Sequence, residues 1–142
     1  MSNREWADRY FEAMNSHDGQ RIAEFMADDA VYEDITLGER HQGKADIAAF
    51  WNSMVPELSS DYRMELKSFV SDGQTYAAEW TLSGTHDGSN AMLPTTGKKF
   101  SIPGATVGTL RGDKIATNRD YWDMVGFLTQ IGMMPAPQGA ST

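Results

Sequence analysis

The chain has 142 residues, a formal net charge of −8 and no cysteine. This length favours one domain with a sizeable core, and the lack of cysteine excludes disulfides, thiolate zinc sites and a cysteine nucleophile. The negative charge disfavours nucleic acid and anionic membrane surfaces as partners. No apolar run approaches the roughly 20 residues that span a bilayer, and the first residues have no signal-peptide core, so we expect a soluble cytoplasmic protein.

The first half of the chain predicts three helices and one short strand. Ser2 or Asn3 can cap the first helix, in which four apolar residues recur at helical spacing: Trp6, Tyr10, Phe11 and Met14. Three further elements follow: a helix over about 21–26, a strand over 30–36 and a helix over about 45–54. The strand places Tyr32 and Asp34 on one face. Residues 37–44 are predicted to form a polar loop.

The second half predicts long antiparallel strands. Period-two alternation indicates three of them: from residue 61 to a hairpin turn at 71–73, from about 76 to 84, and over 100–110. Alternation continued past Gly84 places His86 on the apolar face. A long loop over 87–99 follows, and Pro103-Gly104 interrupts the next strand, which indicates a bend or a sheet edge.

Helices grouped ahead of an antiparallel meander indicate an α+β fold rather than parallel βαβ winding. A strongly curved antiparallel sheet packed on the N-terminal helices would form a cone with a cavity at its open end. We expect a single domain over 1–134 and a flexible tail over 135–142, a segment rich in Pro, Gly, Ser and Ala.

The most concentrated chemistry lies in residues 114–132, a predicted strand that changes near Asp123 into a short helix. Alternation puts five residues on one strand face: Ile115, Thr117, Arg119, Tyr121 and Asp123. The opposite face carries Ala116, Asn118, Asp120 and Trp122. Asp123 has two interpretations, because an aspartate just before a helix is also a common N-cap.

Short motifs spread from about residue 5 to 134 carry a family resemblance. They are Phe11 to His17 with Asp18-Gly19, Ala30-Val31-Tyr32-Glu33-Asp34, Gly43 with Ile47, Phe50 and Trp51, Trp80 with Gly84-Thr85-His86-Asp87-Gly88, Pro94-Thr95-Thr96-Gly97-Lys98, Gly112-Asp113-Lys114-Ile115, and Tyr121-Trp122-Asp123 with Leu128-Thr129-Gln130-Ile131-Gly132. In this order and spacing, the chain resembles the SnoaL-like branch of the nuclear transport factor 2-like superfamily. That superfamily consists of cone-shaped α+β barrels and includes ketosteroid isomerases and polyketide cyclases.

The resemblance implies a cyclase or isomerase that acts on a small apolar carbonyl substrate, polyketide- or steroid-like, without metal or organic cofactor. In SnoaL-like cyclases an aspartate of the last strand is the general base, and the terminal Gln-hydrophobic-Gly motif aligns Asp123 with it. Asp120 is the alternative if the strand carries a bulge. The tryptophan that often stands four residues before the base is Arg119 here, which departs from the pattern. The resemblance also implies a homodimer formed through the outer sheet face.

Several residues could assist Asp123. His86 or Tyr32 could polarise a carbonyl, and Arg119 could either stabilise an enolate or hold Asp123 ionised in an ion pair. Six residues are candidates for binding the substrate: Tyr121, Trp80, Trp51, Met64, Asp34 and Asp120. Each aromatic or methionine side chain also fits an ordinary core. No His, Asp or Glu spacing resembles a metal site.

Two other functions fit the same residues. A limonene-type epoxide hydrolase would need two carboxylates, an arginine, a tyrosine and an asparagine, for which the chain offers Asp34, Asp123, Arg119, Tyr32 and Asn118. Asn118, however, lies on the opposite strand face. The second alternative is a module that binds a small apolar molecule without turnover. A desolvated, cavity-facing carboxylate without a cation would favour catalysis, whereas tight contact with backbone amides would favour a structural role.

Overall fold

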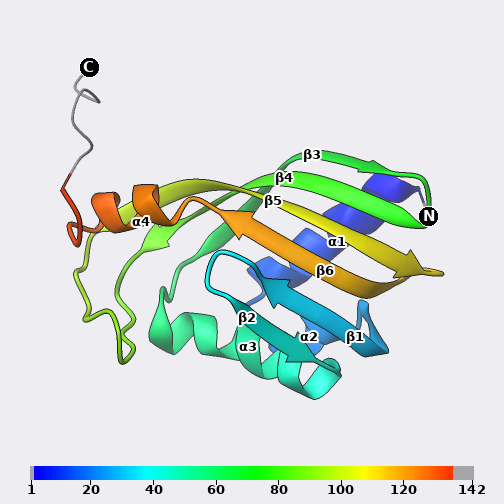
Figure 1. The fold of residues 1–142 in the computed structure, drawn as a ribbon, viewed down its shortest axis with the longest axis horizontal. Coiled ribbons are helices and arrows are strands. Elements are labelled where there is room, and N and C mark those ends of the chain that lie inside the picture. The colour runs from blue at the N-terminus through cyan, green and yellow to red at the C-terminus, as the bar shows by residue number, and fades with distance from the viewer. Residues whose placement is uncertain (1, 136–142) are drawn as a thin grey trace.

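The computed structural model describes residues 2–135 as four helices and one six-stranded sheet (Figure 1). The helices are α1 (Asn3–Asn15), α2 (Gly19–Ala23), α3 (Lys44–Glu57) and α4 (Met124–Gln130). The strands are β1 (Met26–Asp34), β2 (Glu39–Gln42), β3 (Arg63–Ser71), β4 (Thr75–Thr85), β5 (Lys99–Arg111) and β6 (Lys114–Trp122). In this part of the chain, no helix has the length and apolar character needed to cross a membrane. The predicted tail over 135–142 lies almost entirely outside the described residues. The end of the domain at 134 and the start of the tail at 135 therefore stay predictions.

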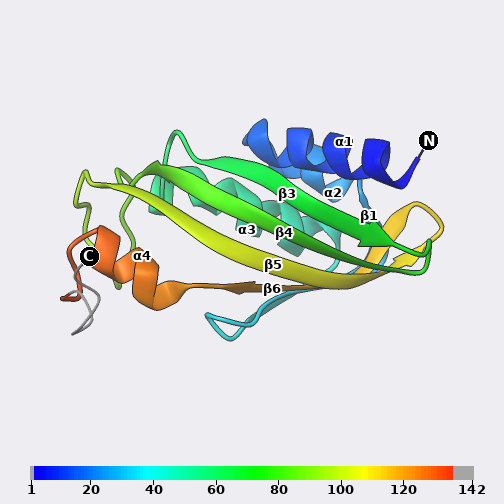
Figure 2. The same ribbon diagram turned by 90° about the horizontal axis from the view of Figure 1, so that it is seen from above.

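The strands lie in the order β2-β1-β6-β5-β4-β3. Neighbouring strands are antiparallel except β1 and β6, which run parallel. The sheet is curved and unclosed; α1, α2 and α3 lie on one of its faces, and α4 lies at one end (Figure 2). The predicted α+β class, with a curved and mainly antiparallel sheet packed on the N-terminal helices, is confirmed.

Three boundaries in the first half differ from the sequence prediction. Helix α2 begins at Gly19 because the Asp18 side chain caps it, accepting a hydrogen bond from the Gln20 backbone N at 2.9 Å. Strand β1 begins earlier than predicted, at Met26, which pairs with Ile115 of β6. The predicted polar loop contains β2, which pairs with β1 at the edge of the sheet. Strand β2 buries almost no side chain, so its sequence carries no apolar alternation.

Helix α1 lies across the inner face of the sheet. The Ser2 Oγ accepts a hydrogen bond from the Glu5 backbone N at 3.1 Å, which confirms one of the two predicted caps. The predicted apolar stripe is buried: Trp6, Tyr10, Phe11 and Met14. At the other end, the Asn15 side chain donates to the Met64 carbonyl at 2.9 Å and accepts from the Met64 N at 2.7 Å. These bonds fix the helix to the edge strand β3, with its aromatic residues above the sheet.

Two glycines of β5 make room for aromatic rings of β4. Trp80 pairs with Gly104, and Tyr76 pairs with Gly108. A Cβ atom would lie 2.2 Å from the Trp80 ring at Gly104 and 2.5 Å from the Tyr76 ring at Gly108. Both rings can therefore lie close against the inner face of β5. The strand continues through Pro103, which pairs with Thr81 of β4 and stands one residue beyond Gly104, the last residue paired with β6.

A bulge in β3 changes which side chains face inward. The register of β3 on β4 shifts between Leu66 and Ser68, so Lys67 is an extra residue. Because side chains alternate along a strand, one extra residue reverses the faces that follow it. Phe69 therefore faces the interior, as Leu66 does, although strict alternation from Leu66 would turn it outward.

Candidate active site: an aspartate in an aromatic cavity

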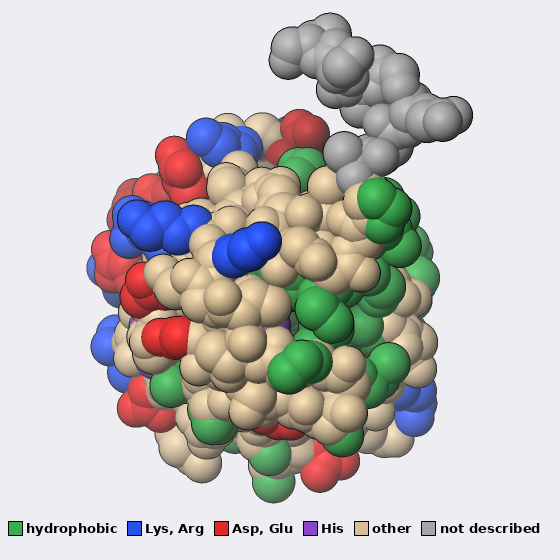
Figure 3. Space-filling view, turned by 90° about the vertical axis from the view of Figure 1, so that its left-hand side faces the viewer, with side chains coloured by type: hydrophobic (Ala, Val, Ile, Leu, Met, Phe, Trp, Pro, Cys, Tyr) green, Lys and Arg blue, Asp and Glu red, His purple; other side chains and the backbone are tan. Residues whose placement is uncertain are grey.

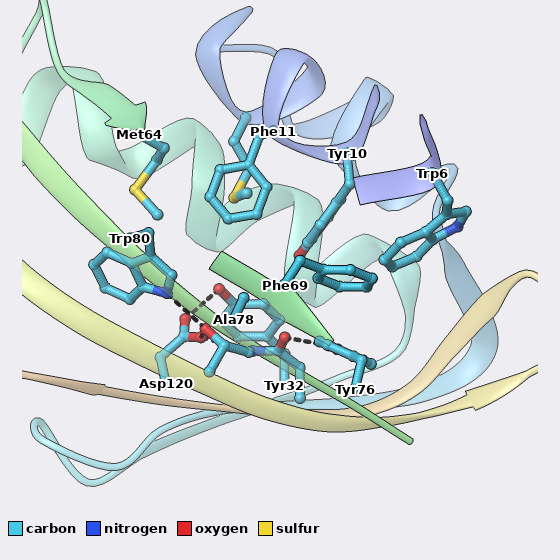
Figure 4. A pocket seen from close by; sticks show the side chains of 13 residues that line it. Trp6, Tyr10, Phe11, Tyr32, Met64, Phe69, Tyr76, Ala78, Trp80 and Asp120 are labelled. Atoms are coloured by element: carbon cyan, nitrogen blue, oxygen red, sulfur yellow. Dashed lines mark hydrogen bonds between the residues drawn. The ribbon is translucent and has the colours of Figure 1, made fainter. Parts of the chain in front are cut away.

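The inner face of the sheet and α1 enclose a cavity that contains one ionisable carboxylate, that of Asp120. We call it the inner cavity (Figure 4). Its lining residues are Trp6, Tyr10, Phe11, Met14, Tyr32, Met64, Phe69, Tyr76, Ala78, Trp80, Thr106, Asn118 and Asp120. Its free volume is about 10 Å³, room for about one water molecule. The side chains of α1 and the sheet therefore nearly fill it.

Three side chains donate hydrogen bonds to the Asp120 carboxylate. Oδ1 accepts from the Thr106 hydroxyl at 2.6 Å and from the Asn118 Nδ2 at 2.9 Å. Oδ2 accepts from the Tyr32 hydroxyl. The donors come from β1, β5 and β6, three strands that neighbour one another in the sheet. The carboxylate is thus held in one orientation from three directions.

A second layer of hydrogen bonds orients two of these donors. The indole Nε1 of Trp80 can only donate, and it lies 2.8 Å from the Thr106 Oγ1, so the proton of Thr106 is left for Asp120. The Tyr76 hydroxyl donates to the Asn118 Oδ1 at 2.6 Å, which directs the amide nitrogen of Asn118 to Asp120. The rings that the glycines of β5 accommodate therefore also set the polarity of the network.

Burial dominates the electrostatics of Asp120. Desolvation raises the pKa of Asp120 to about 6, although the bonds from Thr106, Tyr32 and Asn118 oppose it, and the nearby Asp34 adds to the rise. None of the residues that line the inner cavity is a lysine or an arginine. A desolvated carboxylate without a cation, the condition that favours catalysis, is therefore met by Asp120.

Tyr10 supplies a hydrogen-bond donor that has no partner. It descends from α1 into the inner cavity (Figure 4), is 4% exposed, and its hydroxyl makes no hydrogen bond within the described residues. Burial raises the pKa of Tyr10 well above its usual value, so the phenol keeps its proton. A buried donor without a partner is costly, and an oxygen atom of a bound molecule could accept this bond.

A bulge in β6 decides which aspartate faces the cavity. Thr117 pairs with Thr109 and Ile115 with Leu110, so Ala116 is an extra residue. Ile115, Asn118 and Asp120 consequently share the inner face. This is the bulge on which the alternative assignment to Asp120 depends.

Asp123 lies outside the inner cavity and caps α4. Its side chain is exposed, and Oδ1 accepts a hydrogen bond from the Gly126 backbone N at 2.9 Å. Contact with a backbone amide is the condition that favours a structural role. Arg119 and Tyr121 are exposed on the outer face of β6. The group proposed for an epoxide hydrolase is also divided, because Tyr32 and Asn118 line the cavity and Arg119 does not.

Four of the predicted site residues come together in the inner cavity: Tyr32, Met64, Trp80 and Asp120. Three others lie in the surrounding core. Trp51 packs edge-on against Tyr32, with ring centroids 6.0 Å apart. Asp34 accepts hydrogen bonds from the Trp122 Nε1 at 3.1 Å and the Leu37 N at 2.9 Å. His86 is fully buried beside Phe127 of α4, away from Asp120.

Sequence reasoning did not place Tyr10, Tyr76 and Thr106 in a candidate site, and it considered Asn118 only for an epoxide hydrolase. The two tyrosines lie on apolar stripes that predict an ordinary core. Asn118 and Asp120 are two residues apart, so they share a strand face whatever the register. That spacing was the signal from which Asn118 could have been grouped with Asp120. The sequence around Thr106 carried no comparable signal. Within residues 2–135, no three His, Asp or Glu side chains form a group that could hold a metal ion.

The sequence of the chain matches one family model over most of its length. The model is that of the SnoaL-like domain, and it matches residues 7–118. The chain belongs to the SnoaL-like domain family. The predicted resemblance is thereby confirmed. No curated protein matches the chain in sequence.

Solved structures support the same family and fold. A Pseudomonas putida protein described as a candidate polyketide cyclase is 30% identical, with a TM-score of 0.76, and the match covers 92% of this chain and 98% of that one. A Catenulispora acidiphila protein with a ketosteroid isomerase-like fold, solved in complex with trimethylamine, is 20% identical, with a TM-score of 0.81 over 94% of this chain and 96% of that one. A candidate hydroxylase from Streptomyces galilaeus is also 20% identical, with a TM-score of 0.79 over 95% and 88%. At 20% identity, the last two show the SnoaL-like fold alone.

Proposed function

We propose that the chain is a cofactor-independent cyclase or isomerase whose general base is Asp120. The base would remove a proton α to the carbonyl group of a small apolar substrate. The observation that carries this proposal is a buried carboxylate in a cavity lined by aromatic rings, where desolvation raises the pKa of Asp120 to about 6. A general base is most effective when its pKa lies near the working pH, and desolvated carboxylates in clefts are enriched at active sites.

The proton transfer leaves negative charge on the carbonyl oxygen. The C–H electron pair forms the enolate, the proton passes to the Asp120 carboxylate, and the oxygen needs a donor. The Tyr10 hydroxyl is the donor in the cavity that has no other partner. The sequence suggested His86 or Tyr32 as the group that polarises the carbonyl. We assign this role to Tyr10, because the Tyr32 hydroxyl already donates to Asp120 and His86 does not line the inner cavity.

Cyclisation and isomerisation share this first step, so the network alone does not choose between them. An enolate that attacks a second carbonyl of the same molecule closes a ring, whereas an enolate reprotonated at another carbon isomerises. The relative from Pseudomonas putida, a candidate polyketide cyclase, supports the first outcome. The aromatic lining supports an apolar reacting end in either case.

The proposal is tested by proton exchange, which needs no knowledge of the natural substrate. We expect the protein to accelerate deuterium incorporation at the methyl group of acetylnaphthalene in D₂O, followed by proton NMR. Asp120→Asn should reduce the accelerated rate about 10²- to 10⁴-fold, and Tyr10→Phe about 10²-fold or more. Asp123→Asn is the matched control, because it removes a carboxylate from the same segment but outside the cavity, and it should leave the rate unchanged. An Asp120→Asn variant as fast as the parent would refute the assignment.

A different observation supports the alternative, a module that binds a small molecule without turnover. Three donors already occupy the Asp120 carboxylate, and the inner cavity is nearly full. Such a carboxylate could serve only to hold β1, β5 and β6 together. An NMR titration separates the two functions: a pKa of Asp120 near 6 supports the base, and a pKa below about 4 supports the structural role.

A further inference from the structure

The inner cavity shares a wall with a second depression at the N-terminal end of α1. This depression, which we call the outer groove, lies between the start of α1 and the two hairpins β3–β4 and β5–β6. Trp6 and Phe69 line both the inner cavity and the outer groove. A molecule in the outer groove is therefore separated from the inner cavity by two aromatic side chains.

The two spaces differ greatly in size. The outer groove has a volume of about 340 Å³, against about 10 Å³ for the inner cavity. Small-molecule pockets typically enclose roughly 300–1,000 Å³. The outer groove has the size of a ligand site, and the inner cavity can receive only a part of a ligand that displaces side chains.

The wall can open at little cost in hydrogen bonds. The Trp6 indole Nε1 donates one bond, to the Asp113 carbonyl in the β5–β6 turn, at 2.9 Å. Four aromatic rings lie against the indole: Tyr10 at 5.5 Å, Phe25 and Phe69 at 6.0 Å, and Tyr76 at 5.9 Å between centroids. A flat apolar group that takes the place of the indole would recover the same kind of contact.

The polar lining of the outer groove favours one chemistry. Ser2, Asn3 and Ser71 provide polar side chains, Leu110 provides an apolar one, and Asp113 is the only charged residue among those that line it. Among the described residues that line the outer groove there is no lysine or arginine, so a carboxylate there would meet the like charge of Asp113. A hydroxyl or ammonium group could donate to the carboxylate of Asp113.

We propose that the outer groove is a second binding subsite of the same substrate. It takes a tail that ends in a hydrogen-bond donor, a hydroxyl or an ammonium, while the apolar carbonyl end passes Trp6 toward Asp120. This inference rests on the proposed function for the identity of the reacting end. The subsite itself selects against substrates whose tail is a carboxylate.

Calorimetry with matched probes tests the subsite. The probes are acetylnaphthalene itself and three derivatives that carry a propyl chain ending in a hydroxyl, an ammonium or a carboxylate. We expect the hydroxyl and ammonium probes to bind more tightly than the parent ketone, and the carboxylate probe to bind more weakly. Asp113→Asn keeps the backbone carbonyl that holds Trp6, and it should reduce the preference for ammonium over carboxylate about two- to fivefold.

Two variants of α1 locate the binding. Asn3→Trp fills the outer groove and should abolish the advantage of the tailed probes, whereas Arg9→Trp adds the same exposed ring to α1 outside the groove and should retain it. The subsite is refuted if tailed and tail-less probes bind equally, if no probe binds, or if Asn3→Trp and Arg9→Trp behave alike. Failure of the proposed function would give a different result. If Asp120 is not a base, the protein would still prefer the tailed probes but would not exchange their α-protons.

Discussion

At the scale of single residues, the raised pKa of Asp120 predicts how stability depends on pH. The pKa is about 6 in the folded protein, whereas an aspartate in an unfolded chain titrates near 3.9. The folded state therefore binds this proton more tightly, and the stabilisation is fully present below about pH 4 and lost as the pH rises through about 6. We expect the free energy of unfolding to fall by on the order of 3 kcal/mol across this range relative to Asp120→Asn, measured by urea denaturation. A pH-independent difference between the two proteins would contradict this.

The burial of His86 predicts the opposite dependence of stability on pH. His86 is fully buried, its Nδ1 lies 2.9 Å from the Thr96 Oγ1, and its Nε2 has no hydrogen-bond partner among residues 2–135. Burial lowers the pKa of His86 below its usual 6.5, with Asp87 opposing the shift. The unfolded chain then binds the proton more tightly, so the contribution is present above about pH 6.5 and lost at lower pH.

The measurement for His86 is amide hydrogen exchange of the loop over 87–98. Acidification below about pH 6 should increase local opening of this loop in the parent chain, beyond the known pH dependence of the intrinsic exchange rate. His86→Gln retains a side chain that can bond to Thr96 but cannot titrate there, so its local opening should stay constant. Equal behaviour of the two proteins would show that His86 does not titrate in this range.

At the scale of elements, Gly104 of β5 predicts a specific steric conflict. A Cβ atom at this position would lie 2.2 Å from Cη2 of Trp80 and 2.4 Å from Cζ3. Both atoms belong to the outer, six-membered ring of the indole. The ring of a phenylalanine in place of Trp80 would not reach so far from the backbone. Gly104→Ala should destabilise the protein by about 1–3 kcal/mol, measured by denaturant unfolding.

A double-mutant cycle supplies the control for Gly104. Trp80→Phe alone also loses the hydrogen bond to the Thr106 hydroxyl, and so it carries its own cost. The double variant should be more stable than the sum of the two single effects, because the shorter ring removes the clash. Additive effects would mean that the Trp80 ring does not occupy the space in front of Gly104.

The two strand bulges show why the sequence predicted the fold better than the site. The alternation of apolar residues predicts the inward set in β4 and in β3 up to Leu66, and the sheet depends on those residues. Phe69 and Asp120 lie beyond bulges, at Lys67 and Ala116, where pairing with the neighbouring strand inserts an extra residue. Pairing between strands depends on the tertiary structure and cannot be read from one strand alone. Strict alternation from Ile115 therefore grouped Ile115 with Arg119 and Tyr121, which face outward, instead of with Asn118 and Asp120. The Asn118–Asp120 spacing is local, so the sequence could place these two residues together but not inside.

At the scale of the whole molecule, the outer sheet face predicts a homodimer. The helices α1, α2 and α3 cover only the inner face (Figure 2), and Ala77, Ala105 and Val107 lie on the outer face of β4 and β5. Tyr121 adds a ring that is 43% exposed. At the end that carries α4, apolar side chains also gather along one side of the surface (Figure 3). Ala77, Ala105 and Val107 are half-buried in the single chain, and apolar side chains grouped on an uncovered sheet face often mark interfaces.

Sedimentation measurements test the homodimer. The parent chain should sediment at twice the monomer mass, and Val107→Lys should shift it toward the monomer, because a buried unpaired charge is costly at an interface. Gln20→Lys adds the same charge on α2, on the opposite side of the sheet, and should leave the mass unchanged. A parent chain of monomer mass at micromolar concentration would contradict the prediction.

The extra residue in β6 also affects how site residues are transferred between relatives. An alignment without a gap at Ala116 would match inward-facing residues of this chain with outward-facing residues of any relative whose last strand has no bulge. The residue assigned by such an alignment would be one position from Asp120 and on the outer face, as the exposed Arg119 and Tyr121 are. Site residues in this family should therefore be compared by superposing the last strand in space, and a single deletion there is expected to change the active site more than most substitutions.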